Sequence, residues 1–208
     1  MRVVCISDTH GMLNKIAIPD GDVLIHAGDA TNRGTHRQVY EFARDMSRLP
    51  HRVKIFVAGN HDFGFQDHRE QFQDLVESAG VTYLQDSYVI VDGFKVYGSP
   101  WQPEFHSWAF NLPRGKPLAD VWAKIPADTD VLVTHSPPDS IMDTAPGEVH
   151  VGCADLAVVV SEIRPRLHIF GHIHECYGTK VIGETMFVNA ASCNGGYEPI
   201  NAPIVIDL

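Results

Sequence analysis

VVCISDTHG, residues 3–11, is the stretch that decides how the rest of the chain is interpreted. An apolar run, Val3 to Ile6, gives way within two residues to Asp8 and His10, whose side chains can both bind a metal. The same change from apolar run to polar loop follows residues 23–25, 53–57, 131–133 and 167–170. If these runs are strands of one sheet, their carboxyl ends meet at a single crevice, which is where open α/β sheets bind ligands.

Seven side chains that can bind a metal follow these apolar runs, each where a strand is expected to end. They are Asp8, His10, Asp29, Asn60, His135, His172 and His174. A group of His, Asp and Asn side chains that converges in space is typical of a two-metal site. The sequence therefore predicts an enzyme with a binuclear metal centre.

Length and composition favour a single domain over residues 1–208. No apolar run approaches the roughly 20 residues of a membrane span, so we expect no membrane partner. The net charge is −10 and no block of Lys or Arg occurs, which argues against a long nucleic acid as partner. A small phosphate ester remains compatible with this charge, because bound divalent ions would reverse the local potential.

The four cysteines, at positions 5, 153, 176 and 193, form neither a C-x-x-C pair nor a zinc-finger spacing. Cys5 lies inside the first expected strand, and we interpret it as a small buried apolar residue. That strand begins almost at Met1 and leads to Asp8, so a cleaved signal peptide is not expected. These features together predict a cytoplasmic protein.

Helical and extended patterns alternate along the chain. Apolar residues recur with the i, i+3, i+4, i+7 spacing of a helix in four segments, which start at Val39, Phe72, Leu118 and Leu156. Further strands are expected at 88–91, 94–98, 186–190 and 204–207, and Asp92-Gly93 is a hairpin signal between the first two. A partly antiparallel sheet with helices outside favours a layered α/β sandwich.

The segment from Gly98 to Gly115, GSPWQPEFHSWAFNLPRG, has neither period. Long irregular loops in compact domains are usually functional. Two interpretations are open for its aromatic residues, which either pack over a sheet edge or form a wall beside the substrate. They are Trp101, Phe105, Trp108 and Phe110.

The metal-capable residues belong to five short motifs, in chain order D-x-H, G-D, G-N-H-D, T-H and G-H-x-H. With these motifs the chain resembles the calcineurin-like metallophosphoesterases. The stretches GSPWQP, FNLPRG, VTHSPP, VGC and FGHIHECYG make it most similar to the metallophosphoesterase-domain-containing branch, over essentially the whole chain. The resemblance implies a four-layer α/β/β/α sandwich with two mixed sheets. Animal members of that branch can carry Gly where this chain has His172.

The resemblance also implies the ligands of two divalent ions. One ion is assigned to Asp8, His10, Asp29 and His174, and the second to Asp29, Asn60, His135 and His172, so that Asp29 bridges. This mixed nitrogen and oxygen set suits transition metals better than Ca²⁺ but does not choose among them. The expected ion is Mn²⁺, with Fe, Zn, Co or Ni as alternatives. A hydroxide shared by the two ions would attack the phosphate.

His61 and Asp62 of G-N-H-D are the expected catalytic residues. The resemblance places His61 opposite the substrate phosphate, where we predict that it protonates the leaving oxygen or stabilises its charge. Asp62 is expected to orient the His61 ring. A role for Asp62 as an ordinary turn acceptor or helix cap stays open.

The remaining histidines of the 12 are expected to be structural or peripheral. His26 is interpreted as a core residue, whereas His36, His51, His68 and His168 are interpreted as surface or helix-end residues. His106 and His150 lie in loops that can reach the site, and Arg114 is either a phosphate contact or an exposed cation. Positive φ angles are expected at three glycines that precede ligands, Gly28, Gly59 and Gly171.

Three functions are compatible with this constellation. The first is a phosphodiesterase acting on small esters such as cyclic nucleotides, in which the aromatic loop stacks on a base. The second is a phosphomonoesterase or phosphatase using the same metal centre. The third is a non-catalytic binding module on the same fold. The possibility of a homodimer is left open.

Overall fold

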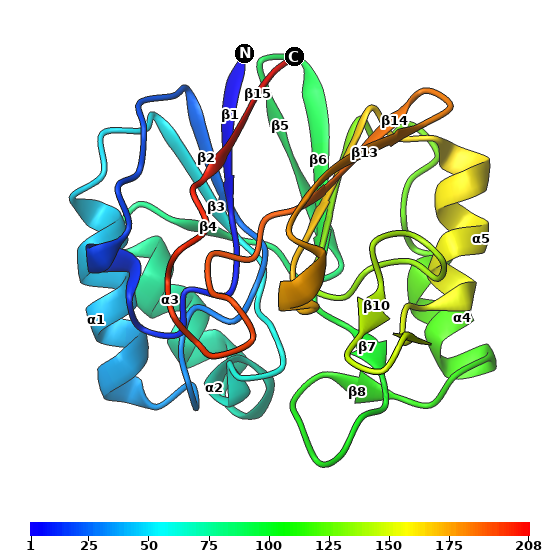
Figure 1. The fold of residues 1–208 in the computed structure, drawn as a ribbon. Coiled ribbons are helices and arrows are strands. Elements are labelled where there is room, and N and C mark those ends of the chain that lie inside the picture. Colours follow the sequence, from blue (N-terminus) through cyan, green and yellow to red (C-terminus); the bar gives the residue numbers. More distant parts are fainter.

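Two β-sheets pack face to face in the computed structural model, which describes residues 1–208, and helices cover both outer faces (Figure 1). In the first sheet, β1 to β4 are parallel and β15 pairs antiparallel with β1. Its strands in spatial order are β15 (Ile204–Asp207), β1 (Arg2–Ile6), β2 (Val23–His26), β3 (Val53–Phe56) and β4 (Thr82–Tyr83). Its outer face is covered by α1 (His36–Ser47) and α3 (Arg69–Glu77), with the short α2 (Phe63–Asp67) between them in sequence.

The second sheet has four parallel strands between two antiparallel edges. Its strands in spatial order are β13 (Gly178–Ile182), β14 (Thr185–Asn189), β12 (Leu167–Phe170), β9 (Val131–Thr134), β6 (Phe94–Ser99) and β5 (Ser87–Val91). The helices α4 (Lys116–Trp122) and α5 (Ala154–Ile163) cover its outer face. The four-layer α/β/β/α sandwich with two mixed sheets is thus confirmed.

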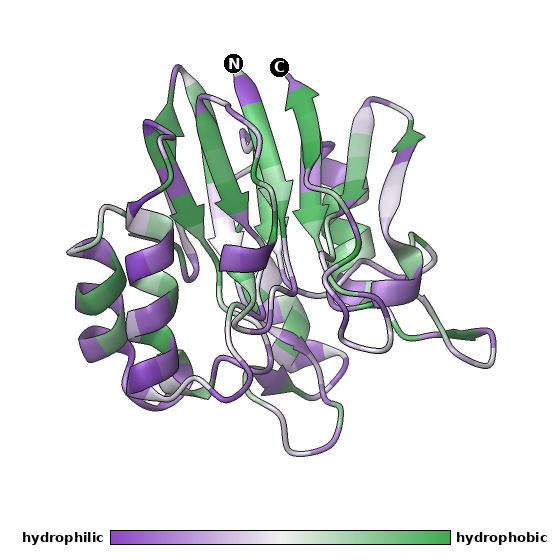
Figure 2. Ribbon diagram, turned by 60° about the vertical axis from the view of Figure 1, so that its left-hand side comes forward, coloured by the Kyte–Doolittle hydropathy of each residue, from purple (hydrophilic) through white to green (hydrophobic).

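Alternation of side chains along the strands explains why the apolar runs are continuous. In β1, Val3 and Cys5 point between the two sheets, whereas Val4 and Ile6 point to the helices. A strand with both faces covered has no polar side, so it is apolar throughout. Cys5 is fully buried, as predicted. Figure 2 shows the apolar strands between helices whose outer sides are hydrophilic.

The helices form at the predicted apolar stripes. In α1 the stripe Val39, Phe42, Ala43 and Met46 is entirely buried, and Thr35 begins the helix with a capping box. The helices α3 and α4 are shorter than their stripes, which end at Ala79 and Ile125. None of the helices combines the length and the apolar character that crossing a membrane requires.

Small elements escaped the sequence analysis. Strand β13 is exposed on both sides, so it carries no alternating apolar signal. Four two-residue strands pair outside the two sheets, and two 3-10 turns lie in the loops. They are β7 (Gln102–Pro103) with β8 (Asn111–Leu112), β10 (Thr144–Ala145) with β11 (Val149–His150), η1 (Leu13–Lys15) and η2 (His174–Cys176).

Two histidines assigned to the surface are in fact buried, which corrects the prediction. His168 has no exposed surface and its Nε2 lies 2.9 Å from Thr134 Oγ1. His51 is also buried, and its Nε2 lies 3.0 Å from Pro19 O. In both cases a hydrogen-bond partner from a distant segment makes burial of the ring acceptable. His26 is a buried core residue, as predicted.

Candidate metal centre

The seven predicted metal ligands all lie in loops that leave the carboxyl ends of parallel strands. Those strands are β1, β2 and β3 in the first sheet and β9 and β12 in the second. The two sheets join at this end, where Ser7 forms a parallel bridge with Ala191 and Ser192 N–H donates to Ser7 O. Both chain termini lie at the opposite end (Figure 1). The structure therefore gathers ligands from both sheets.

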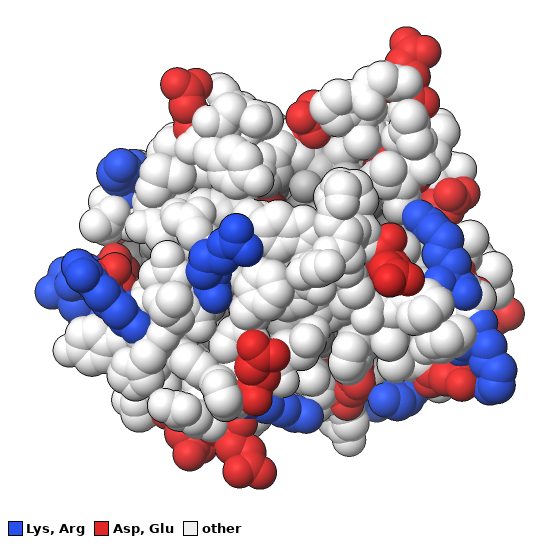
Figure 3. Space-filling model, turned by 90° about the horizontal axis from the view of Figure 1, so that it is seen from below, with Lys and Arg blue, Asp and Glu red and all other residues white.

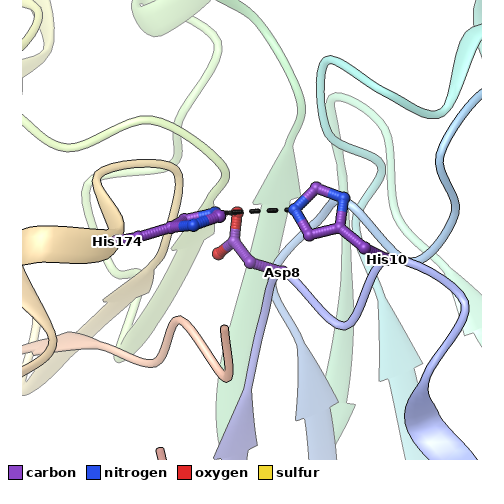
Figure 4. A group of neighbouring side chains, drawn as sticks. All are labelled: Asp8, His10 and His174. Carbon is purple, nitrogen blue, oxygen red and sulfur yellow. Dashed lines mark hydrogen bonds and ion pairs between the residues drawn. The ribbon is translucent and has the colours of Figure 1, made fainter. Parts of the chain in front are cut away.

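Asp8, His10 and His174 form the first cluster, and one ligand atom of each lies within 4.8 Å of the others. His174 Nε2 is 3.3 Å from Asp8 Oδ1 and 3.5 Å from His10 Nε2. Figure 4 shows the three side chains pointing toward one another, Asp8 and His10 from the loop after β1 and His174 from the segment after β12. The three groups can bind one ion together.

Asp29, His135 and His172 form the second cluster, again with one ligand atom of each within 4.8 Å of the others. His135 Nε2 is 3.3 Å from Asp29 Oδ2 and 3.0 Å from Asn60 Oδ1. Asn60 thus adds a neutral oxygen to two imidazoles and one carboxylate. These are the four residues that the resemblance assigned to the second ion.

The Asp29 carboxylate lies between the two clusters. Its Oδ1 accepts a hydrogen bond from the backbone N–H of His61 over 2.8 Å. Its Oδ2 is 3.3 Å from His135 Nε2 in the second cluster and 4.0 Å from His10 Nε2 in the first. A single oxygen atom therefore faces ligands of both clusters.

The ring orientations of His135 and His174 test whether these residues fit a metal. His135 Nδ1 lies 2.9 Å from Ala27 O and His174 Nδ1 lies 2.9 Å from Asn194 O. A carbonyl only accepts, so Nδ1–H must donate, and Nε2 of the neutral ring carries the lone pair. Each Nε2 lone pair then faces an oxygen acceptor, Asp29 Oδ2 or Asp8 Oδ1. Such facing acceptors fit a cation between them.

The charges agree with this interpretation. Burial opposes ionisation of Asp8 and Asp29, but His174 and His135 more than offset it and hold the pKa of both carboxyls well below its usual range. Burial likewise opposes charge on the two imidazoles, yet the same carboxylates raise the pKa of His135 and of His174 to about 9. Without a metal, a proton therefore takes the place of the cation between each carboxylate and its imidazole.

Four residues of the two clusters have backbone angles that are rare for residues with a side chain. Asp8, His10, Asp29 and His172 have φ angles of 51°, 44°, 54° and 67°. The expected positive φ occurs at Gly28 but not at Gly59 or Gly171, which corrects two of the three glycine predictions. Strain at such positions persists only where the surroundings hold it, and it is concentrated at functional sites.

Gly59 and Gly171 are instead needed for close approach. A Cβ at Gly59 would overlap Asp29 Oδ1, and a Cβ at Gly171 would overlap Asp8 Oδ2 and Ser7 Oγ. Both glycines therefore leave the space that the two carboxylates occupy. The predicted importance of these glycines rests on space rather than on backbone conformation.

His61 lies beside both clusters, but Asp62 does not orient it. His61 Nδ1 is 3.1 Å from Asn32 O, and its Nε2 is 3.9 Å from Asp29 Oδ2. The Asp62 carboxylate is fully buried and accepts hydrogen bonds from the backbone N–H groups of Ala30, Thr31 and Gly59. The structure thus gives Asp62 the alternative role of a turn acceptor, and gives the orienting contact to Asn32, which the sequence analysis missed.

A cavity of about 340 Å³ opens beside the metal-capable residues. Asp29, Asn60, His172 and His174 form one part of its wall, and His61 borders them. The other lining residues are Pro103, Glu104, Phe105, Trp108, Arg114, Ser136, Ala145, Pro146, Val151, Ile173, Glu175, Gly195 and Tyr197. Neither His106 nor His150 is among the lining residues, so the structure does not bring these two to the site.

The aromatic segment is divided between the two interpretations. Phe110 is fully buried and Trp101 packs against the core, whereas Phe105 and Trp108 line the cavity. The Trp108 ring lies over His61, with centroids 4.3 Å apart. Tyr197, which the sequence analysis missed, packs against His10 from the other side, with centroids 4.7 Å apart. A glycine pair before Tyr197 was the only local signal of a tight loop.

The fold is shared with solved structures of low sequence identity. Phosphopantetheinyl hydrolase of Mycobacterium tuberculosis superposes with a TM-score of 0.69 at 14% identity, over 97% of this chain and 95% of that chain. TT1561 of Thermus thermophilus does so with a TM-score of 0.61 at 19% identity, over 90% and 88%. At such identities the likeness concerns the fold alone.

Fold and centre together define a class, the metal-dependent phosphoesterases. The family model for calcineurin-like phosphoesterases matches residues 1–176, and the chain belongs to that family. Human metallophosphoesterase domain-containing protein 1 is 44% identical over an alignment of 232 positions, which covers 100% of this chain and 71% of that protein. UPF0046 protein K07C11.7 of Caenorhabditis elegans is 44% identical over an alignment of 218 positions, which covers 99% of this chain and 74% of that protein.

Proposed function

We propose that the protein is a binuclear phosphodiesterase that hydrolyses small phosphodiesters, cyclic nucleotides among them. The observation that carries the proposal is the position of Asp29 Oδ2, which faces His135 Nε2 in one cluster and His10 Nε2 in the other. One carboxylate between two cations offsets their mutual repulsion. The residues thus fit two ions, with Mn²⁺ as the expected metal.

Bound divalent ions supply a nucleophilic water near neutral pH and offset the charge of the phosphate. The protein holds the ligands in place for them. Ala27 O and Asn194 O fix the rings of His135 and His174, so that each Nε2 points inward. The backbone N–H of His172 donates to Asp8 and that of His61 donates to Asp29, which fixes both carboxylates. The ligand positions are therefore set before metal binds.

His61 acts at the leaving oxygen in this proposal. Asn32 O accepts from Nδ1–H, so Nε2 is the nitrogen that faces the centre and that binds and releases a proton. Trp108 covers one face of the ring. A covered imidazole beside the phosphate site is well placed to protonate an alkoxide as the P–O bond breaks.

The shape of the cavity supports a diester rather than a small monoester. Phosphodiesters carry organic groups on two oxygens, and a cavity of about 340 Å³ is far larger than one phosphate. Aromatic rings of Phe105, Trp108 and Tyr197 line it and suit the planar part of a nucleotide. The free cysteines agree with a reducing compartment, and we include a cytoplasmic location in the proposal.

Turnover by the Mn²⁺-loaded protein tests this function. The substrates are bis-p-nitrophenyl phosphate, 2′,3′-cyclic AMP and 3′,5′-cyclic AMP, with p-nitrophenyl phosphate as the monoester. We expect at least one diester to be hydrolysed with a higher kcat/KM than the monoester. Hydrolysis of the monoester while every diester stays intact would overturn the diesterase assignment and favour a phosphomonoesterase.

A further inference from the structure

Arg114 is the one Lys or Arg side chain among the residues that line the cavity. Its Nη1 donates to Gly152 O over 2.7 Å and its Nη2 donates to Val151 O over 2.9 Å. Both partners are neutral carbonyls, so these contacts leave the positive charge uncompensated. A guanidinium has five N–H donors, and these two bonds leave the others for a ligand.

The backbone that carries these two carbonyls is held in place by Asp143, whose carboxylate is buried. Asp143 is 1% exposed and accepts from the backbone N–H groups of Gly152 and Ser140 over 3.1 and 3.0 Å. Its own carbonyl accepts from Val151 N–H over 3.1 Å. At Gly152 a Cβ would clash with the backbone of Pro138, so the chain is closely packed there. The loop that positions the guanidinium is thus fixed by contacts independent of any ligand.

We propose that Arg114 binds a second oxyanion of the substrate, a carboxylate or a phosphate separate from the one that is cleaved. This rests on the proposed function, in which the scissile phosphate lies at the metal centre of the same cavity. Guanidinium geometry matches the paired oxygens of carboxylate and phosphate. Because the side chain is already held by Val151 and Gly152, little conformational entropy is lost when the anion binds.

Other charges in the cavity limit where such an oxyanion can bind. Figure 3 views the end of the molecule opposite the chain termini, where basic and acidic side chains are scattered rather than gathered into one block. Glu104 and Glu175 line the cavity, and both side chains are exposed. Their carboxylates repel an anion, so away from the metal centre Arg114 is its single favourable site. The diester that Arg114 favours therefore carries an anionic group on one arm. A diester without a second anion, cyclic AMP included, would bind at the metal centre without this contact.

Matched inhibitor pairs test the proposal on the Mn²⁺-loaded protein, with bis-p-nitrophenyl phosphate as reporter. Each pair is an alkylphosphonate and the ω-carboxyalkylphosphonate of equal length, with spacers of one to five carbons. Alkylene bisphosphonates of the same lengths show which oxyanion is preferred. We expect one spacer length at which the added carboxylate lowers the inhibition constant about tenfold, the size of a charge-assisted hydrogen-bonded contact at a partly exposed site.

Variants of Arg114 separate binding from structure. The ratio compared is the inhibition constant of the alkylphosphonate divided by that of the ω-carboxyalkylphosphonate of equal length. Arg114→Gln should bring this ratio to about one. Arg114→Lys should leave an intermediate ratio, because the charge remains without the paired N–H groups of the guanidinium. Glu104→Gln is the control and should keep or increase the ratio. A ratio near one at every length in the wild type would overturn the proposal, as would an unchanged ratio in Arg114→Gln. If alkylphosphonates inhibit but the added carboxylate gives no gain, the proposed function still stands and only the role of Arg114 is wrong. If neither the alkylphosphonates nor the ω-carboxyalkylphosphonates inhibit, both proposals are contradicted.

Discussion

His168 is a buried histidine whose low pKa couples the stability of the fold to pH. The ring is fully buried between Phe170 and Phe187, and its Nε2 lies 2.9 Å from Thr134 Oγ1. The Thr134 hydroxyl donates to Ser136 O, so His168 Nε2–H must donate to Thr134 Oγ1. His168 Nδ1 is buried without a hydrogen-bond partner, so a second proton there would be unsatisfied and the neutral ring is favoured. Burial lowers the pKa of His168 to about 3. The unfolded chain therefore binds more protons than the folded protein between pH 6.5 and 3, and stability falls as pH falls.

We predict a corresponding loss of unfolding free energy in acid. Between about pH 7.5 and pH 5, His168 alone should reduce the free energy of unfolding by about 2 kcal/mol. In His168→Gln, where an amide replaces the titrating ring, the fall over the same interval should be smaller by that amount. Urea unfolding of both proteins at the two pH values measures the difference. Parallel pH profiles would show that the ring does not remain neutral.

Substitutions of Asp29 and of His61 should have different effects, the first on metal binding and the second on catalysis alone. Asp29→Asn removes the charged oxygen that faces both clusters, so it should reduce bound metal well below two ions per chain and abolish turnover. His61→Ala leaves both clusters intact and should lower kcat by about 10²- to 10⁴-fold with metal content unchanged. Metal analysis after gel filtration, together with kcat, checks both variants. Equal metal loss in the two would contradict this division of roles.

At the scale of elements, the sequence predicted which metal-capable residues lie together, but it did not predict their hydrogen-bond partners. Asp8, Asp29 and His135 each follow a strand closely, so the end of a local apolar run marks them. The partner of His61 was misassigned because Asn32 lies 29 residues away, on a loop whose approach no local pattern encodes. The contact between Arg114 and Gly152, which are 38 residues apart, could not be predicted for the same reason. Strand β13 was missed because it is exposed, whereas its neighbours β14 and β12 have buried patterns.

Two glycine turns of the second sheet should respond differently to an added methyl group. Gly171, after β12, has no room for a Cβ because Asp8 and Ser7 occupy the space. Gly171→Ala should therefore displace Asp8 and weaken metal binding at least about tenfold. Gly183, between β13 and β14, has open space but a φ angle of 59°. Gly183→Ala should lower stability by about 1 kcal/mol without changing metal affinity. Calorimetric titration with Mn²⁺ measures the metal affinity of the two variants, and urea unfolding measures their stability. Equal metal affinities in the two variants would show that Asp8 does not need the space at Gly171.

Across the whole molecule, the candidate metal centre lies where the two halves of the sandwich meet. Asp8, His10, Asp29 and Asn60 come from loops of the first sheet, and His135, His172 and His174 come from loops of the second. Unfolding separates these groups, so we expect ions to bind the folded state and to stabilise it by mass action. Mn²⁺ at about 100 times its dissociation constant contributes about 2.7 kcal/mol per site. For a chain of this length that corresponds to a rise in Tm of about 5–10 °C per site.

Thermal unfolding with chelator and with increasing Mn²⁺ measures this coupling. We expect Tm to rise with the logarithm of free Mn²⁺ in the wild type and in His61→Ala, which keeps every ligand. Asp29→Asn should show a much smaller rise, because its missing charge faces ligands from both sheets. A wild-type Tm that is the same with chelator and with Mn²⁺ would mean that the two sheets are not joined through bound metal. The rise in Tm also requires no substrate, so it tests the centre independently of the ester that the enzyme cleaves.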